Sequence, residues 1–325
     1  RRQHAFCTMD HIVDTIPGRS DDTLMPSGRD FIVATRSAAR ETGIQLFDIQ
    51  DPDQGIVHVI SPELGIALPG LSLICPDSHT CTLGGLGVLA WGVGSTEAEH
   101  ALATSTLRVT RPQTMRVQFI GSMAEHVTAK DLILYTIRSL SASGGAGYAI
   151  EFAGPAIVAL PVESRLTLCN MATELSAFTG LIAPDEQVID YCQGRPFAPR
   201  GAAWEAAIRH WQTLQSDADA QFDSEHRIDI GSLKPQLTWG TSPQHCIDWD
   251  EEIPGAGEAP DEATAASWQQ AQAYMGVTAG HRLSDYPLDA AFIGSCTNSR
   301  LSDLRDAASY LTQTGHRVAK GVKAL

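Results

Sequence analysis

The order of apolar and polar positions along the chain predicts strands and helices that alternate. Strands are expected where short apolar or alternating runs are bounded by turn residues, and helices where apolar residues recur every three or four positions. The predicted strands lie at about residues 55–60, 71–75, 148–154 and 288–294. The predicted helices lie at about residues 29–43, 95–107, 128–140, 170–179, 185–192 and 201–214. Strands that alternate with helices are typical of an α/β fold.

This α/β pattern divides into three parts. We expect an α/β domain over residues 1–112, a second over 113–285, and the start of a third over 286–325. The acidic stretch 249–265, rich in proline, glycine and alanine, is the best candidate for a linker. Both ends of the sequence look cut, since it begins without methionine and ends where another apolar strand would begin.

The turn that follows residues 288–294 carries a first candidate for chemistry. A helix is expected to begin after it, with Asn298 or Ser299 as the N-cap. Cys296 would then lie between the carboxyl end of a buried strand and a helix N-terminus, a place that favours a thiolate and where open α/β sheets bind ligands. The alternative is a small buried cysteine without chemical function, which is the commoner role of a lone cysteine.

Imidazole, carboxylate and amide side chains gather in four further short segments. These are Asp10 with His11, His58 on the predicted strand 55–60, Asp77-Ser78-His79 directly after the strand 71–75, and Asn170 with Glu174. Any one of these histidines, taken alone, is more often structural than catalytic. Only their combination indicates a site.

Composition and charge exclude some partners. Lys and Arg number 23 against 38 Asp and Glu, a net charge of −15, which disfavours nucleic acid and acidic membranes as partners. No apolar span is long enough for a transmembrane helix. The 7 cysteines are scattered rather than arranged as the framework of a small secreted domain, so we expect reduced thiols in a cytoplasmic protein.

Taken in order, these segments resemble one family. The most specific blocks are TMDH at 8–11, CPDSHT at 75–80, RLTLCNMATE at 165–174 and GSCTNSR at 294–300. Over essentially its whole length the sequence is similar to the aconitase superfamily, and within it to the large subunits of 3-isopropylmalate dehydratases. The resemblance implies an aconitase-like fold, in which related three-layer α/β domains surround a central cleft.

The resemblance also implies a hydro-lyase of leucine biosynthesis that isomerises 2-isopropylmalate and 3-isopropylmalate by dehydration and rehydration. Such an enzyme must remove a weakly acidic proton and expel hydroxide. A Lewis-acidic iron and histidines held by carboxylates suit these two tasks.

The family's catalytic histidine–carboxylate pairs can be carried over to this sequence. They correspond to Asp10 with His11, Asp77 with His58, and Glu174 with His79. The resemblance implies that His11 protonates the leaving hydroxyl and that the other two pairs adjust the charge around iron and substrate. Ser78 is a candidate for binding a substrate carboxylate, with a turn cap as its structural alternative.

The resemblance further implies a [4Fe–4S] cluster, of which Cys296 would be the first of three thiolate ligands. Asn170 and Asn298 are candidates for contacts to the cluster. The other two ligands form a C-x-x-C pair in the family, and this sequence contains none. The family's serine base lies on a separate swivelling domain, which is a small subunit in these dehydratases, so we expect a heteromeric partner.

Two positions near the proposed site depart from the dehydratase pattern. Leu83 stands where a histidine is usual, and Pro76 where a glycine is usual. An enzyme acting on another malate, such as methylmalate, dimethylmalate or homoaconitate, is therefore an alternative. A clusterless binding protein, such as an RNA-binding switch, is a third hypothesis, which the net charge of −15 disfavours.

Overall fold

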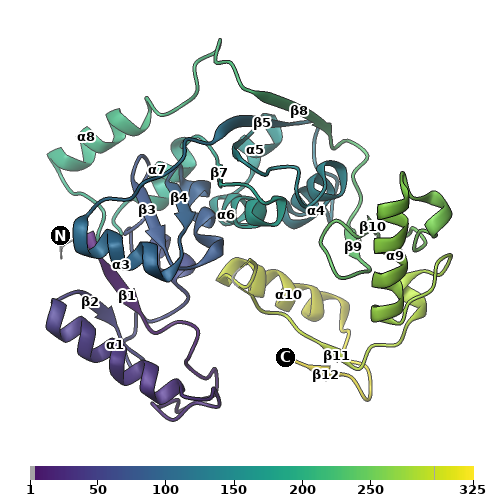
Figure 1. Cartoon of the computed structure of the whole chain (residues 1–325), viewed down its shortest axis with the longest axis horizontal. Coiled ribbons are helices and arrows are strands. Elements are labelled where there is room, and N and C mark those ends of the chain that lie inside the picture. The colour runs from purple at the N-terminus through teal and green to yellow at the C-terminus, as the bar shows by residue number, and fades with distance from the viewer. Residues whose placement is uncertain (1–3, 296) are drawn as a thin grey trace.

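The predicted α/β class is confirmed by the computed structural model, which describes residues 4–295 and 297–325. Figure 1 shows a small N-terminal lobe around α1, a central body around β5, β7 and α6, and a C-terminal part that contains α9 and α10. The strand pairs of the first two regions are parallel, as expected where helices connect successive strands.

The N-terminal lobe is a two-stranded sheet covered by one helix. Strand β1 (Phe6–Thr8) pairs with β2 (Gln45–Phe47), and α1 (Gly28–Thr42) connects them. Helix α1 ends, as predicted, at Gly43, whose φ of 69° suits a residue without a Cβ. The buried core of the lobe consists of Met9, Ile32 and Ile49.

The central body is built on a parallel four-stranded sheet. In order across the sheet, its strands are β7 (Thr179–Leu181), β6 (Tyr148–Ala153), β5 (Gln113–Ile120) and β8 (Ser224–Asp229). The helices that pack around it are α4 (Ala129–Leu140), α5 (Pro155–Ala159) and α6 (Val162–Asn170). Thr128 caps α4, since its hydroxyl accepts from the amide of Asp131 while the Asp131 carboxylate accepts from the amide of Thr128.

A second, two-stranded parallel sheet adjoins this body. It contains β3 (Ser72–Cys75) and β4 (Leu89–Gly92), joined by the 3₁₀ segment η2 (Ser78–Leu86). The remaining helices of this region are α2 (Val57–Glu63), α3 (Ser95–Thr104), α7 (Glu186–Cys192) and α8 (Ala202–Trp211). One core cluster joins residues 67–90 to residues 162–211, so the segments on the two sides of residue 112 share a core.

The C-terminal part begins with β9 (Gln236–Thr238) and β10 (Cys246–Asp248), which pair antiparallel. It continues through η4 (Ala256–Glu258), α9 (Glu262–Met275), η5 (Leu283–Asp285), β11 (Ala290–Ala291), α10 (Leu301–Thr314) and β12 (Lys323–Ala324). The predicted linker 249–265 is partly folded, because Ile253 is buried in a core cluster with Trp239 and Ala271.

The predicted strand at 55–60 is wrong, because His58 lies on helix α2. The run of β-branched residues misled the prediction. The amide of Val57 donates to Asp10 Oδ2 at 2.9 Å, and the amides of Val59 and Ile60 both donate to the Ile56 carbonyl. A tertiary contact at the first turn thus overrides local strand propensity.

The predicted helix at 170–179 is also wrong. Helix α6 ends at Asn170, a short 3₁₀ turn η3 (Met171–Leu175) follows, and the chain then enters β7. The amide of Phe178 donates to the Tyr148 carbonyl, and this bond begins the ladder with β6. Residues 178 and 179 therefore pair with β6 in the sheet, and the predicted helix cannot continue to residue 179.

Of the buried strand predicted at 288–294, only Ala290 and Ala291 form a strand, β11. The prediction that this strand is buried is wrong, because the segment is exposed. Leu288, Phe292 and Ile293 are 68%, 71% and 57% exposed. Strand β11 pairs with β12, and no core cluster of the described residues includes it. The cap of α10 is Arg300 rather than Asn298 or Ser299, since the helix begins at Leu301.

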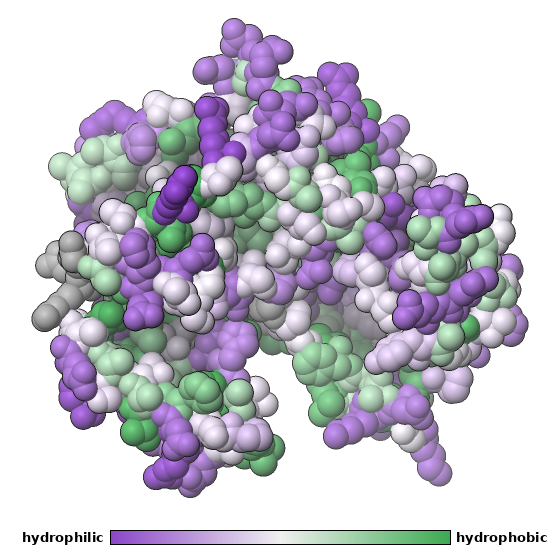
Figure 2. Space-filling view, in the orientation of Figure 1, coloured by the Kyte–Doolittle hydropathy of each residue, from purple (hydrophilic) through white to green (hydrophobic). Residues whose placement is uncertain are grey.

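The surface is hollowed between the N-terminal lobe and α10. Figure 2 shows this notch, with apolar side chains gathered near α10 on one of its sides. The exposed apolar residues of α10 are Leu301, Leu304, Tyr310 and Leu311. Within 4–295 and 297–325, no helix combines the length and apolar character needed to cross a membrane.

Candidate active site

Asp77 is the centre of the polar cluster. It follows strand β3 and caps η2, where its Oδ1 accepts the amide hydrogen of His79 at 2.8 Å. Two glycines allow η2 to approach its neighbours closely. A Cβ on Gly84 would lie 1.7 Å from the Gly180 carbonyl oxygen, and a Cβ on Gly85 would lie 2.7 Å from the Leu166 amide nitrogen. The glycine-rich sequence after residue 80 thus allows η2 to pack against β7 and α6, which fixes Asp77 at the strand end.

Three imidazoles that come from distant parts of the chain surround this carboxylate. His58 Nε2 lies 3.1 Å from Asp77 Oδ1, off the line of a regular hydrogen bond, and His58 is only 1% exposed. His11 Nε2 lies 3.6 Å from Asp77 Oδ2, and His79 Nδ1 lies 3.8 Å from Oδ1. The structure therefore brings together the three histidines that the sequence singled out.

Two further carboxylates complete the cluster. Asp10 Oδ1 lies 3.3 Å from His11 Nδ1, and Glu174 Oε1 lies 3.4 Å from His79 Nε2. Both ring nitrogens of His11 face carboxylate oxygens, so a doubly protonated ring finds an acceptor on each side. The His11 side chain is 70% exposed, which leaves it open to a ligand.

Ser78 is exposed beside this cluster. Its Oγ lies 3.3 Å from His79 Nδ1, and its side chain does not cap η2, because Asp77 does. The geometry leaves the hydroxyl available to a substrate group. The proposed contact to a substrate carboxylate stays a prediction.

The electrostatics favour an ionised Asp77. The contact with His58 is the main cause that holds the pKa of Asp77 well below its usual range, and the amide of His79 adds to it, while burial acts in the opposite direction. Burial raises the pKa of Cys75 to about 11 and that of Cys81 to about 12, so these nearby thiols stay protonated. They are poor metal ligands in this form.

Asn170 connects the histidine cluster to the turn 297–300. Its side chain is fully buried, donates from Nδ2 to Thr82 Oγ1 at 2.8 Å, and accepts from Thr297 Oγ1 at 2.8 Å. Thr82 Oγ1 in turn donates to the backbone carbonyl of His79 at 2.5 Å. A continuous line of hydrogen bonds therefore runs from His79 to the turn.

Cys296, the predicted cluster ligand, lies outside the described residues. Its neighbour Asn298 donates to Thr167 Oγ1 at 3.3 Å and to Asp303 Oδ1 at 3.5 Å. The side-chain amide of Asn170 and the Nδ2 of Asn298 thus hold protein partners, whereas the buried Oδ1 of Asn298 has no hydrogen-bond partner among the described residues. Their proposed contact to a cluster stays a prediction. Among the described residues, no group of three or more His, Cys, Asp or Glu side chains is placed to hold a metal ion.

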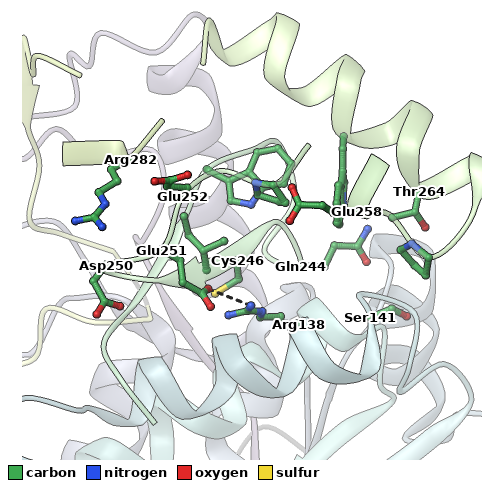
Figure 3. Close-up of a pocket in the computed structure, with 15 residues that line it drawn as sticks. Arg138, Ser141, Gln244, Cys246, Asp250, Glu251, Glu252, Glu258, Thr264 and Arg282 are labelled. Carbon is green, nitrogen blue, oxygen red and sulfur yellow. Dashed lines mark ion pairs between the residues drawn. The ribbon is translucent and has the colours of Figure 1, made fainter. Parts of the chain in front are cut away.

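A separate cavity of about 800 Å³ lies between α4, β10 and α9. Figure 3 shows its charged lining, in which Glu251 forms an ion pair with Arg138 at 3.1 Å. Asp250 pairs with Lys234 at 2.7 Å, and Glu258 Oε1 accepts the amide hydrogen of Gly255. Its acidic side chains are largely held by protein partners, and none of the clustered histidines lines it. The histidine cluster is therefore the better candidate for catalysis.

Comparison with known proteins decides the family. The family model described as aconitase family (aconitate hydratase) matches residues 1–325. The chain belongs to the aconitase family. A protein named 3-isopropylmalate dehydratase large subunit 1, from Bradyrhizobium diazoefficiens, is 51% identical to it over 319 residues, which cover 98% of this chain. The chain spans 66% of the length of that aconitase-family relative.

The predicted family is thus confirmed, but the sequence did not reveal several neighbours of the candidate site. Thr82, Thr167 and Arg300 are buried polar residues that contact the site or its adjoining turn. The pattern of apolar and polar positions along the sequence does not mark these threonines and this arginine as site residues. Thr167 and Arg300 lie within the blocks RLTLCNMATE and GSCTNSR, which could have drawn attention to them, whereas Thr82 lies in neither.

Proposed function

We propose that this chain forms part of the large subunit of a dehydratase that isomerises 2-isopropylmalate and 3-isopropylmalate in leucine biosynthesis. The identity of 51% to a protein of that name supports the proposal, as does membership of the aconitase family. The observation that carries it is the convergence of His11, His58 and His79 on the single carboxylate of Asp77.

This arrangement suits the expulsion of hydroxide from a hydroxy acid. His11 is the exposed member of the cluster and would protonate the departing hydroxyl, with Asp10 and Asp77 orienting its ring. The pair His79–Glu174 would adjust the charge beside it, and Ser78 would bind a substrate carboxylate. The His58–Asp77 pair lies deeper and would hold the negative charge in place.

The aconitase-family dehydratases generally carry a [4Fe–4S] cluster, which when bound supplies a Lewis-acidic iron for the substrate hydroxyl. The turn 297–300 fits one corner of such a group, since hydroxyl and amide side chains surround it and donors of this kind stabilise thiolate-bound clusters. Cys296 would be the ligand from this turn. The described cysteines, which are all free and most of which are buried, do not complete the ligand set.

The name of the relative, a large subunit, supports a small-subunit partner for this chain. We propose that the partner supplies the catalytic base and closes the cleft. The six described cysteines are free thiols, which supports a reducing compartment such as the cytoplasm.

The test is an assay of the full-length protein, assembled anaerobically with its small subunit and loaded with iron and sulfide. Formation of the unsaturated acid from 3-isopropylmalate is followed by its ultraviolet absorbance, with methylmalate, dimethylmalate and homoaconitate assayed in parallel. Turnover of 3-isopropylmalate that His11→Asn lowers at least a hundredfold supports the proposal. Turnover confined to another malate would replace the substrate but not the reaction, and no turnover of any acid by cluster-loaded protein would overturn both.

The alternative of another malate rests on fewer positions than the sequence suggested. Leu83 is completely buried in the core cluster around Leu86 and Val88, so it does not line the cleft. Pro76 is exposed directly before Asp77 and is the departure that could reach a substrate. Substrate choice is thus tested best at Pro76.

A further inference from the structure

The turn 297–300 is held onto α6 by one buried hydroxyl group. Thr167, on α6, is 2% exposed, and its Oγ lies 3.1 Å from the Thr297 carbonyl oxygen. The hydroxyl oxygen of Thr167 also accepts from Asn298 Nδ2 at 3.3 Å and from Arg300 Nη1 at 3.4 Å. Thr167 therefore contacts three of the four residues in the turn, which lie about 130 positions further along the chain.

The hydroxyl is used to its full capacity. A threonine hydroxyl offers one hydrogen and two lone pairs. The carbonyls of Thr297 and Glu163, at 3.1 and 3.2 Å, are the acceptors within reach of the hydrogen, and Asn298 and Arg300 are the donors to the oxygen. Arg300, which is 5% exposed, also donates to the Thr297 carbonyl at 3.0 Å. Removing this oxygen would leave several buried polar groups with fewer partners, which is costly.

The turn itself needs such support. Ser299 has a φ of 144°, a conformation that residues with a side chain rarely adopt. Its amide and that of Arg300 both donate to Asp303 Oδ2 at 3.0 Å, which fixes the end of the turn to α10. The other end is fixed to α6 by Thr167 and Asn170. Such strain persists only where the surroundings over-determine the backbone, and it occurs often at functional sites.

We propose that Thr167 is a positioning residue that holds the turn 297–300 in its strained geometry against α6, at a fixed place relative to His79. The line of bonds from His79 through Thr82 and Asn170 to Thr297 sets that place. The inference deepens the proposed function and rests on it only for the role of Cys296 as ligand. The geometry of the described turn stands without it.

Amide hydrogen exchange in the full-length, cluster-free protein tests the proposal. Thr167→Val keeps the volume of the side chain and removes the hydroxyl. We expect the amides of Ser299 and Arg300 to exchange about ten to a hundred times faster in this variant, because the turn opens more often. Thr167→Ser keeps the hydroxyl and should restore slow exchange.

Thr136→Val is the matched control. Thr136 is equally buried, on α4, but among the described residues its hydroxyl bonds only within its own helix, to the Leu132 carbonyl at 2.8 Å. This variant should leave exchange in the turn unchanged. If both valine variants give the exchange of the unaltered protein, or if both accelerate it equally, Thr167 has no positioning role.

A second variant covers the case in which Thr167→Val unfolds the protein, which accelerated exchange in β5 would reveal. Asn298→Ala removes one donor to Thr167, together with the longer 3.5 Å contact to Asp303 Oδ1, from the partly exposed side and spares the core. Faster exchange confined to Ser299 and Arg300 in this variant supports the proposal, and no change overturns it. The measurement needs neither cluster nor substrate, so its failure is distinct from failure of the proposed function.

Discussion

The imidazole of His58 and the carboxylate of Asp77 meet at 3.1 Å although they come from different elements, a helix and the segment after a strand. His58 is almost completely buried, while Asp77 is 18% exposed and faces two further histidines. One carboxylate therefore serves three rings. Its loss should affect the whole cluster rather than one member.

Asp77→Asn tests this shared role. The amide has nearly the shape of the carboxylate but carries no charge, so it cannot stabilise a protonated ring. We expect kcat of the assembled holoenzyme to fall by about a hundredfold or more, the scale of a lost acid–base group. Asp217→Asn, at an exposed carboxylate, is the control and should retain activity. Equal activity of the two variants would show that Asp77 is structural.

The pH dependence of stability should report the same carboxylate. The contact with His58 holds the folded pKa of Asp77 below its unfolded value, so the unfolded chain binds more protons in acid. The contribution is thus complete above the unfolded pKa, about 4, and is lost as pH falls toward the lower folded pKa. Urea unfolding between pH 6 and 3 should show the difference between the native protein and Asp77→Asn narrowing below about pH 4. A difference that stays constant over this range would contradict the assignment.

The elements that the sequence predicted correctly are those in which local and tertiary preferences agree. Helix α4 has a capping threonine and a regular apolar face, and it was predicted within one residue. The predicted strand at 55–60 failed because the favoured state depends on Asp10, 47 positions earlier, which accepts the amide hydrogen of Val57. No window of local sequence contains that contact.

The candidate site shows the same division. Its histidines and carboxylates were found from motif blocks, and the structure brings them together around Asp77. The threonines that support them could not be found, because Thr82 and Thr167 act through contacts to residues that lie 88 and about 130 positions away. Such contacts require the fold. Cys296 lies outside the described residues and stays a prediction.

Asn170 and Thr297 should be energetically coupled through the hydrogen bond between their side chains. Asn170→Ala removes the partner of two hydroxyls, those of Thr82 and Thr297, and should cost about 2 kcal/mol of unfolding free energy. In a double-mutant cycle with Thr297→Val, we expect a coupling energy of about 1 kcal/mol, measured by chemical denaturation. Additive effects would mean that the bond contributes nothing to holding the turn.

Leu83 offers a test of whether the departure from the dehydratase pattern acts on stability or on substrate choice. Because the side chain is completely buried among apolar neighbours, Leu83→His places an imidazole where no polar partner is expected. We expect a loss of about 2 kcal/mol or more in unfolding free energy, without a change in the ratio of rates on 3-isopropylmalate and methylmalate. Leu83→Met, which conserves volume, should cost less than about 1.5 kcal/mol. A changed ratio would place residue 83 within reach of the substrate.

The ion pair between the buried Arg165 and the partly exposed Asp185 should be a sensitive support of α6. Arg165 is completely buried and donates to the Leu160 and Val158 carbonyls as well as to Asp185 Oδ2 at 2.7 Å. Asp185→Asn can still cap α7 but leaves the guanidinium without its counter-charge. We therefore expect a loss of about 3 kcal/mol in unfolding free energy.

The matched control is the exposed pair Lys234–Asp250, whose N–O distance is also 2.7 Å. Asp250→Asn should change unfolding little, because solvent screens that pair. Since α6 also carries Thr167 and Asn170, Asp185→Asn should accelerate amide exchange at Ser299 and Arg300 as well, whereas Asp250→Asn should not. An equal loss of stability in both variants would mean that burial of Arg165 adds nothing to the pair, and α6 would then be held by its apolar contacts alone.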